Sequence, residues 1–188
     1  MKKLFFTLIL ILFTMNLMAQ EHLSFKGIPI EGSIAEFCKK LEAKGFTSLG
    51  NEDNIEMFTG DFTGREASVA VASTDDGKNV FSVIVFFEPS DEWNSLVSTY
   101  NYYKDLYIRK YGKPAKSKEK NPSSSDSNGL LMWELYQGTV VWGSLWKVTG
   151  GDIEISIEKS GIDQGMVMIR YRDAQNVEAK IQKDLEDI

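Results

Sequence analysis

The sequence predicts an α+β domain with an antiparallel sheet of about seven strands and a C-terminal helix. Three observations favour this class. Strand-like segments come in runs that are separated by amphipathic helical segments, and short turns containing glycine join the strands. Each half of the chain has the order helix then meander, which suggests a tandem duplication. Residues 20–188 are also enough for one domain with its own core.

The first segment, residues 1–19, has the pattern of a secretory signal peptide. Two lysines precede an apolar run at 4–13, and Ala19 is a small residue suited to cleavage. The run is shorter than the roughly 20 residues that cross a bilayer. The only cysteine, Cys38, is not at the cleavage point, so we expect a soluble periplasmic or secreted protein and not a lipoprotein.

The first half of the domain begins with an extended segment and a short helix at 33–45. Ser33 and Glu36 form a capping box, and a glycine ends the helix. Asp76 and Gly77 suit a tight hairpin turn between the second and third strands. The third strand is apolar on both faces, so we expect it to be central and covered on both sides. The strands of this half are expected at 54–62, 66–73 and 79–88.

The second half begins with a longer helix at 89–114, capped by Ser90 or Asp91. The segment 113–129 is rich in Lys, Ser, Pro and Asn and has no apolar period, so it is predicted to be a mobile loop. A last helix begins near Asp173. The buried stripe of the long helix is predicted to contain Trp93, Leu96, Val97, Tyr100, Tyr103 and Tyr107. Strands are expected at 130–137, 139–148, 152–159 and 166–172.

Two stretches carry a resemblance: "FKGIPIEGSIAEFCKKLEAKGF", and "FTGREASVAVASTDDGKNVFSVIVFFEPSDEWNSLVSTYNYYKDLYIRKYGKP". Through them the chain resembles a group of uncharacterised secreted or periplasmic proteins of Bacteroides-type gut bacteria. The resemblance implies a location outside the cytoplasm and carries over no catalytic residue. The order of a helix and a meander is also similar to β-lactamase-inhibitor-like domains and to outer-membrane-assembly lipoprotein domains. That likeness implies protein binding through a sheet face.

Composition and charge exclude several classes of partner. Loss of the two lysines of the leader changes the formal net charge from -6 to -8. Nucleic acids and anionic membranes attract concentrated Lys and Arg, so neither is expected as a partner, and we expect no membrane insertion after cleavage of the leader. The expected partner is a periplasmic or extracellular protein.

The sequence contains little catalytic or metal-binding chemistry. His22 is the only histidine and lies near the expected mature N-terminus, so no catalytic triad, metal site or cofactor is predicted. Cys38 lies on the apolar side of its helix and is expected to be structural. Glu154 and Glu158 share a strand face but stand about 13 Å apart, which is too far for a glycosidase pair. Glu134 on a neighbouring strand remains an alternative partner.

Aromatic surfaces are the remaining candidates for binding. Trp142 and Trp146 lie on one face of a strand, and Trp133 is expected on the preceding strand. The three rings form either part of the core or a platform for a partner. Tyr102 and Tyr111 depart from the buried stripe of the long helix and are further binding candidates.

Two functions follow from these observations. The preferred hypothesis is a non-catalytic binding protein that contacts a protein partner through a sheet face, an aromatic surface or the 113–129 segment. The alternative is a small hydrolase acting on glycan or peptidoglycan through paired carboxylates. An exposed apolar patch favours the first, and a pocket with converging acidic side chains favours the second.

Overall fold

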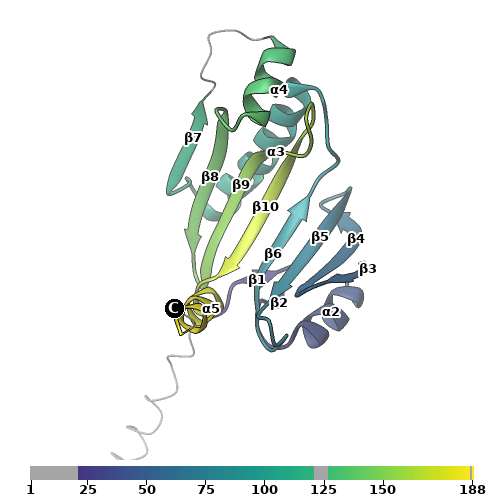
Figure 1. Ribbon diagram of the computed structural model, residues 1–188, viewed down its shortest axis with the longest axis vertical. Coiled ribbons are helices and arrows are strands. Elements are labelled where there is room, and N and C mark those ends of the chain that lie inside the picture. The colour runs from purple at the N-terminus through teal and green to yellow at the C-terminus, as the bar shows by residue number, and fades with distance from the viewer. Residues whose placement is uncertain (1–20, 121–126, 187) are drawn as a thin grey trace, which may run out of the picture.

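The structure is a computed structural model, and it describes residues 21–120, 127–186 and 188. The expected leader at 1–19 lies outside the described residues. The chain forms an α+β fold with a small two-stranded sheet and one antiparallel eight-stranded sheet (Figure 1). The helices are α2 (Ile34–Glu42), α3 (Trp93–Tyr111), α4 (Asn128–Tyr136) and α5 (Ala174–Leu185).

The strands follow the order β3-β4-β5-β6-β10-β9-β8-β7 across the large sheet. Each half of the chain contributes a four-stranded meander, and the last strand of each half pairs with the other at the centre. The small sheet contains β1 (Ser24–Phe25) and β2 (Ile28–Pro29). The large sheet contains β3 (Thr47–Glu52), β4 (Ile55–Phe62), β5 (Arg65–Ser73), β6 (Val80–Phe86), β7 (Lys116–Lys120), β8 (Val141–Val148), β9 (Gly151–Lys159) and β10 (Gly165–Asp173).

Two pairs of corresponding strands in the two halves have the same shift along the sequence. The strands β4 and β8 start at Ile55 and Val141, and β5 and β9 start at Arg65 and Gly151. The shift is 86 residues in both cases (141 less 55, and 151 less 65). The turns that follow β4 and β8 both contain the dipeptide Thr-Gly, at 63–64 and 149–150. These features are those expected of the tandem duplication.

The centre of this repeat lies between β6 and β10. Ile84 pairs directly with Arg170, and 170 less 84 is again 86, so the two equivalent residues face each other. A twofold pseudo-axis therefore passes through this pair. It relates the two halves of the sheet.

The prediction of about seven strands differs from the eight observed for a physical reason. The segment 130–137, predicted as a strand, belongs to helix α4. Its apolar run has no clear period, and such runs do not distinguish a strand from a buried helix. The edge strands β3 and β7 were missed because most of their residues are exposed, which leaves no alternation of apolar and polar side chains.

The prediction of a mobile loop at 113–129 is wrong at 116–120 and at 128–129. Lys116–Lys120 forms strand β7, and α4 begins at Asn128. Residues 121–126 lie outside the described residues. The strand β7 is held by backbone pairing with β8, so it needs no apolar face. Its lysines are typical of edge strands that avoid pairing with other chains.

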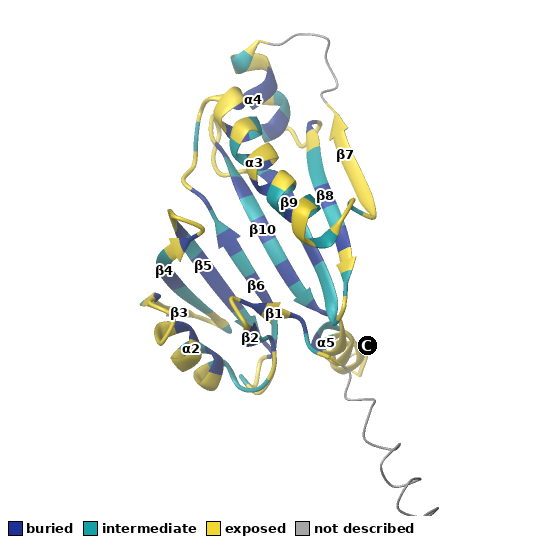
Figure 2. Cartoon of the chain, turned by 180° about the vertical axis from the view of Figure 1, so that it is seen from behind, coloured by how far each residue is buried: buried dark blue, intermediate teal, exposed yellow. Residues whose placement is uncertain are grey.

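Helices α2 and α3 pack on the same face of the sheet. The buried stripe of α3 is confirmed, since Trp93, Leu96, Tyr100, Tyr103 and Tyr107 are all buried. This stripe belongs to one core with the buried residues of α2 and with alternate residues of the strands. Figure 2 shows α3 and α4 in front of the sheet on this side. We call this side the helix face.

The structure confirms the predicted cap of α2 and differs from the prediction for the cap of α3. Ser33 caps α2 as expected, and its hydroxyl accepts from the amide of Glu36 at 3.3 Å. Helix α3 begins at Trp93, after both residues that were expected to cap it. Its first amide instead donates to the side chain of Asn128, at 2.6 Å. The start of α4 therefore caps α3, which no local sequence pattern could indicate.

Candidate functional site

The sheet face opposite α2 and α3 carries side chains of both kinds, apolar and charged. We call this side of the sheet the open face. The pairing register aligns its side chains in rows that run across six strands. Its central row consists of Met57, Ala70, Ile84, Arg170, Glu154 and Leu145. The neighbouring row consists of Thr59, Ser68, Phe86, Met168, Ser156 and Gly143. Small residues such as Ala70 and Ser68 lie between the large ones.

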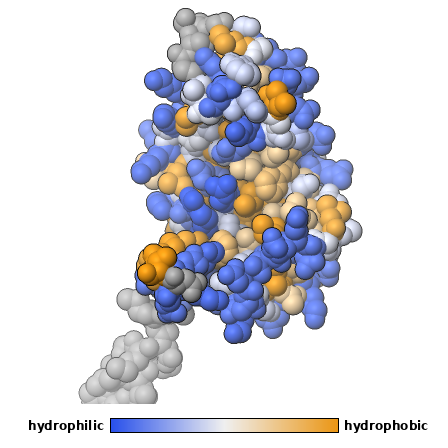
Figure 3. All heavy atoms as spheres, viewed as in Figure 1, coloured by the Kyte–Doolittle hydropathy of each residue, from blue (hydrophilic) through white to orange (hydrophobic). Residues whose placement is uncertain are grey.

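One half of the open face is apolar. Met57, Ile84, Phe86 and Met168 are all half-buried. None of them belongs to the core or to the residues packed against it. Figure 3 shows the corresponding band of apolar atoms across the middle of this face, between hydrophilic regions. In the described part of the chain these four side chains are therefore not packed under a second layer.

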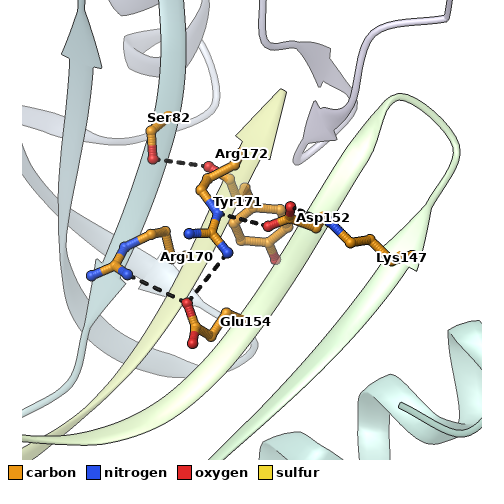
Figure 4. Close-up of polar contacts among 7 residues, drawn as sticks. All are labelled: Ser82, Lys147, Asp152, Glu154, Arg170, Tyr171 and Arg172. Atoms are coloured by element: carbon orange, nitrogen blue, oxygen red, sulfur yellow. Dashed lines mark hydrogen bonds and ion pairs between the residues drawn. The ribbon is translucent and has the colours of Figure 1, made fainter. Parts of the chain in front are cut away.

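The other half of the open face is a network of ion pairs (Figure 4). Arg172 Nε lies 2.7 Å from Asp152 Oδ1, and Lys147 Nζ lies 2.9 Å from Asp152 Oδ2. Glu154 Oε2 lies 3.4 Å from Arg170 and 3.5 Å from Arg172. Each of these pairs is partly exposed, so each contributes little to stability by itself. Together they hold two guanidinium groups in fixed positions beside the apolar half.

On the helix face, β5 and β9 are apolar in both halves, whereas the open face differs between the two halves. Val69 and its equivalent Ile155 are both buried and apolar. On the open face, the equivalent of Ile84 is Arg170, and the equivalent of Phe86 is Arg172. Close packing limits which side chains fit in the core, whereas a side chain on an uncovered face can change without disturbing that packing.

Two shallow pockets border the open face. One has a volume of about 350 Å³ and is lined by Thr59, Ser68, Phe86 and Met166 among others. The second, about 280 Å³, lies beyond Gly143 and includes Glu154 in its lining. One pocket therefore lies at each end of the row that runs from Thr59 to Gly143. Gly143 lies on this face and lines the second pocket together with Leu135 of α4.

For Trp142 and Trp146 the structure favours a role in the core. Trp146 is 1% exposed, and its ring nitrogen donates to the carbonyl of Gly112 at 2.8 Å. Trp142 is half-buried and packs edge-on against Trp93 and Tyr100. Both rings lie on the helix face. They are part of the floor under α3 and do not form a platform on the open face.

The other predicted aromatic residues also lie away from the open face. Trp133 is 52% exposed, but it lies on helix α4 beside Tyr136, so the predicted strand position is wrong. Tyr102 is exposed on α3, with the guanidinium of Arg65 5.1 Å from its ring centre. Tyr111 is half-buried against Tyr107. The structure does not bring these residues together.

The residues of the open face were missed because of how β6 was interpreted. Phe86 and Ile84 alternate with buried valines, so the strand is apolar on both faces, and we expected cover on both sides. The strand is central, as predicted, but only its helix face is covered. A usable signal was present in β10, where Met168, Arg170 and Arg172 follow one another on a single face.

The catalytic alternatives find little support in the geometry. Glu154 and Glu158 do line one pocket. They stand four residues apart on β9, about 13 Å, and Glu154 is engaged by two arginines. Glu134, the alternative partner, lies on α4 and not on a neighbouring strand. In the described ranges no group of three or more His, Cys, Asp or Glu side chains is placed to hold a metal ion.

Cys38 lies partly buried on α2 beside the core. Burial raises the pKa of its thiol to about 12, and the nearby carboxylates of Glu56 and Glu42 act in the same direction. A thiol in this state is a poor nucleophile at neutral pH. The position fits the structural role that was expected for this residue.

Within the part of the chain that the structure describes, no helix is long and apolar enough to cross a membrane. Comparison with protein-family models, with curated proteins and with solved structures finds no match. The open face and its flanking pockets are therefore interpreted from their own chemistry.

Proposed function

We propose that this protein is a secreted or periplasmic non-catalytic binding protein that contacts a protein partner through the open face of its sheet. The leader pattern at 1–19 supports the location, because two lysines precede a short apolar run. The face itself supports the mode of action.

The observation that carries the proposal is the uncovered apolar half of the open face. When both faces of a sheet carry apolar side chains, helices or another sheet normally cover each face. Here Ile84, Phe86 and Met168 stay half-exposed on two adjacent central strands. Contiguous apolar patches of this kind mark interaction sites in proteins that are otherwise well packed.

The composition of the open face matches a protein interface better than a small-molecule site. Met168 pairs with Phe86 in the register, Met166 lines a pocket together with Phe86, and Met57 lies on the same face two strands away. Methionine adapts its shape to irregular partners. Arginine and aromatic residues are enriched at protein interfaces, and both lie here on a flat scaffold. We therefore expect a folded partner that buries an apolar surface on Phe86 and makes charged contacts at its rim.

The test is photo-crosslinking in the cells that make the protein, with a photoreactive phenylalanine analogue in place of Met168. The control carries it at Ile162, which is 65% exposed in the turn between β9 and β10. We expect covalent capture of a partner from position 168 and not from position 162. Equal capture from both positions would contradict the proposal.

A captured partner is then purified, and its affinity is measured directly. Phe86→Glu is expected to weaken binding about tenfold or more, since it places a carboxylate at the centre of the interface. Ile162→Glu makes the same change at an exposed site and should leave affinity unchanged. Unchanged affinity in the Phe86 variant would refute the role of the open face. Phe86 lies outside the core, so the variant is expected to remain folded.

A further inference from the structure

A separate pocket lies on the helix face, between the β1–β2 hairpin and the last turn of α3. Its volume is about 240 Å³. It is lined by the lysines Lys26 and Lys110, by the apolar side chains of Phe62 and Leu106, and by Tyr107 and Tyr171. A second pocket of about 380 Å³ adjoins it and shares Lys26, Lys110 and Tyr171. None of the residues discussed on the open face lines either pocket.

The two tyrosines carry an unused hydrogen-bond donor. Tyr107 is 8% exposed and Tyr171 is 6% exposed, and their hydroxyl groups bond to each other. Each hydroxyl has one hydrogen, and the mutual bond uses only one of the two. Among the described residues neither hydroxyl has another hydrogen-bond partner. A ligand that carries an acceptor atom at this point therefore gains a hydrogen bond from the tyrosine pair.

The charge of the pocket favours an anionic acceptor. The smaller pocket contains two lysines and no acidic side chain. In the described part of the chain neither lysine forms an ion pair. Lys26 donates to the backbone carbonyl of Asp61, and Lys110 lies over the ring of Tyr111. Both ammonium groups keep donors free for a ligand, since each has three.

The backbone around the pocket is held in an unusual conformation. Lys26 has φ 49° and Thr63 has φ 58°, and both line the smaller pocket. Only one other non-glycine residue in the described ranges has positive φ. This conformation is a clear outlier for a β-branched residue such as threonine. Each residue precedes a glycine in a two-residue hairpin loop, Lys26–Gly27 and Thr63–Gly64, and positive φ at both positions is what such a tight turn requires, so these two turns form a fixed border of the pocket.

We propose that this pocket binds a small carboxylate with an aliphatic body. The carboxylate lies near Lys26 and Lys110 and accepts the unused hydroxyl hydrogen of the tyrosine pair. The aliphatic body lies against Phe62 and Leu106. The volume is below the range typical of drug-sized ligands, so the ligand is a short chain.

The first experiment compares three probes by calorimetry with the purified protein. Octanoate has both the charge and the aliphatic body, octanamide has the body alone, and acetate has the charge alone. We expect octanoate to bind with one-to-one stoichiometry and each of the others to bind at least about tenfold more weakly. Failure of octanoate to bind at millimolar concentration would overturn the proposal and would show that water alone satisfies the hydroxyl.

The second experiment tests the named residues. Lys110→Gln should weaken octanoate binding about two- to fivefold, the range of an exposed charge pair. Lys44→Gln is the control, with the same change of charge in the exposed turn that follows α2. Tyr107→Phe and Tyr171→Phe each leave one hydroxyl hydrogen, so each should retain most of the affinity. The double variant has none and should lose it.

Loss of binding must be distinguished from loss of folding in these variants. Thermal melting identifies any variant that is not folded, and the single tyrosine variants show whether loss of a hydroxyl alone disturbs the structure. Equal effects of Lys44→Gln and Lys110→Gln, or full affinity in the double tyrosine variant, would refute the assignment. The proposed function at the open face does not depend on either result.

Discussion

Asp173 provides the sharpest test of how the two ends of the chain are joined. Its side chain is fully buried, at 0% exposure, where β10 meets α5. One oxygen accepts from the amide of Leu23 at 2.9 Å, and the other accepts from the amide of Asn176 at 3.0 Å. His22 Nδ1 lies 3.1 Å from the oxygen that contacts Leu23. One carboxylate therefore caps the last helix and holds the first described segment.

Asp173→Ala removes both interactions, and the cost can be estimated from each. Loss of the helix cap costs about 1 kcal/mol. The amide of Leu23 then stays buried without an acceptor, which costs about 1–3 kcal/mol. The expected loss of unfolding free energy is about 2–4 kcal/mol. For a chain of this size, that loss lowers the melting temperature by about 2–4 °C per kcal/mol.

The assay is urea unfolding followed by circular dichroism, with Asp163→Ala as the control. Asp163 is exposed in the turn between β9 and β10, so its replacement should change the free energy of unfolding by less than about 0.5 kcal/mol. A loss below about 1 kcal/mol for Asp173→Ala would refute the reasoning, because the buried amide would then have another acceptor.

Three further predictions follow from the core. Gly60→Ala places a methyl group 2.6 Å from the ring of Phe46 and should cost about 1–3 kcal/mol in urea unfolding, whereas Gly129→Ala meets nothing within 4 Å and should cost nothing. Cys38, with its raised pKa, should react with a disulfide reagent at pH 8 only after unfolding; fast reaction of the native protein would contradict its burial. Burial raises the pKa of four of the seven tyrosines, so these ionise in the unfolded chain before they do in the native one, and stability should fall as pH rises above about 10. Absorbance at alkaline pH should therefore show that these four tyrosines ionise only when the protein unfolds: Tyr100, Tyr103, Tyr107 and Tyr171.

The elements that were predicted correctly are those in which apolar residues recur at the period of a helix or a strand. The apolar stripe of α3 from Trp93 to Tyr107 and the alternate isoleucines of β9 are buried as expected. Packing on one side of an element makes its apolar residues recur at a regular spacing. The polar edge strand β7 and the apolar helix α4 lack that period. The cap that Asn128 gives to α3 joins residues 35 positions apart. Contacts of this kind depend on the tertiary structure.

The candidate site was harder to predict than the fold. The sequence shows that Phe86 and Ile84 are apolar but does not show that their side of β6 has no covering layer. The tryptophans attracted attention because of their size, and Trp146 proved to be in the core for the same reason, since burying a large ring is strongly favourable. The hydroxyl pair of Tyr107 and Tyr171 joins two distant elements, so no local pattern indicates it.

The central claim is that the open face is uncovered in the isolated protein. Oxidation of methionine by dilute peroxide, followed by mass spectrometry, measures this directly because the rate depends on solvent access. Met57 and Met168 lie half-exposed on the open face, whereas Met132 is 4% exposed in the core. We expect both open-face methionines to oxidise much faster than Met132. Equal protection of all three would contradict an uncovered face.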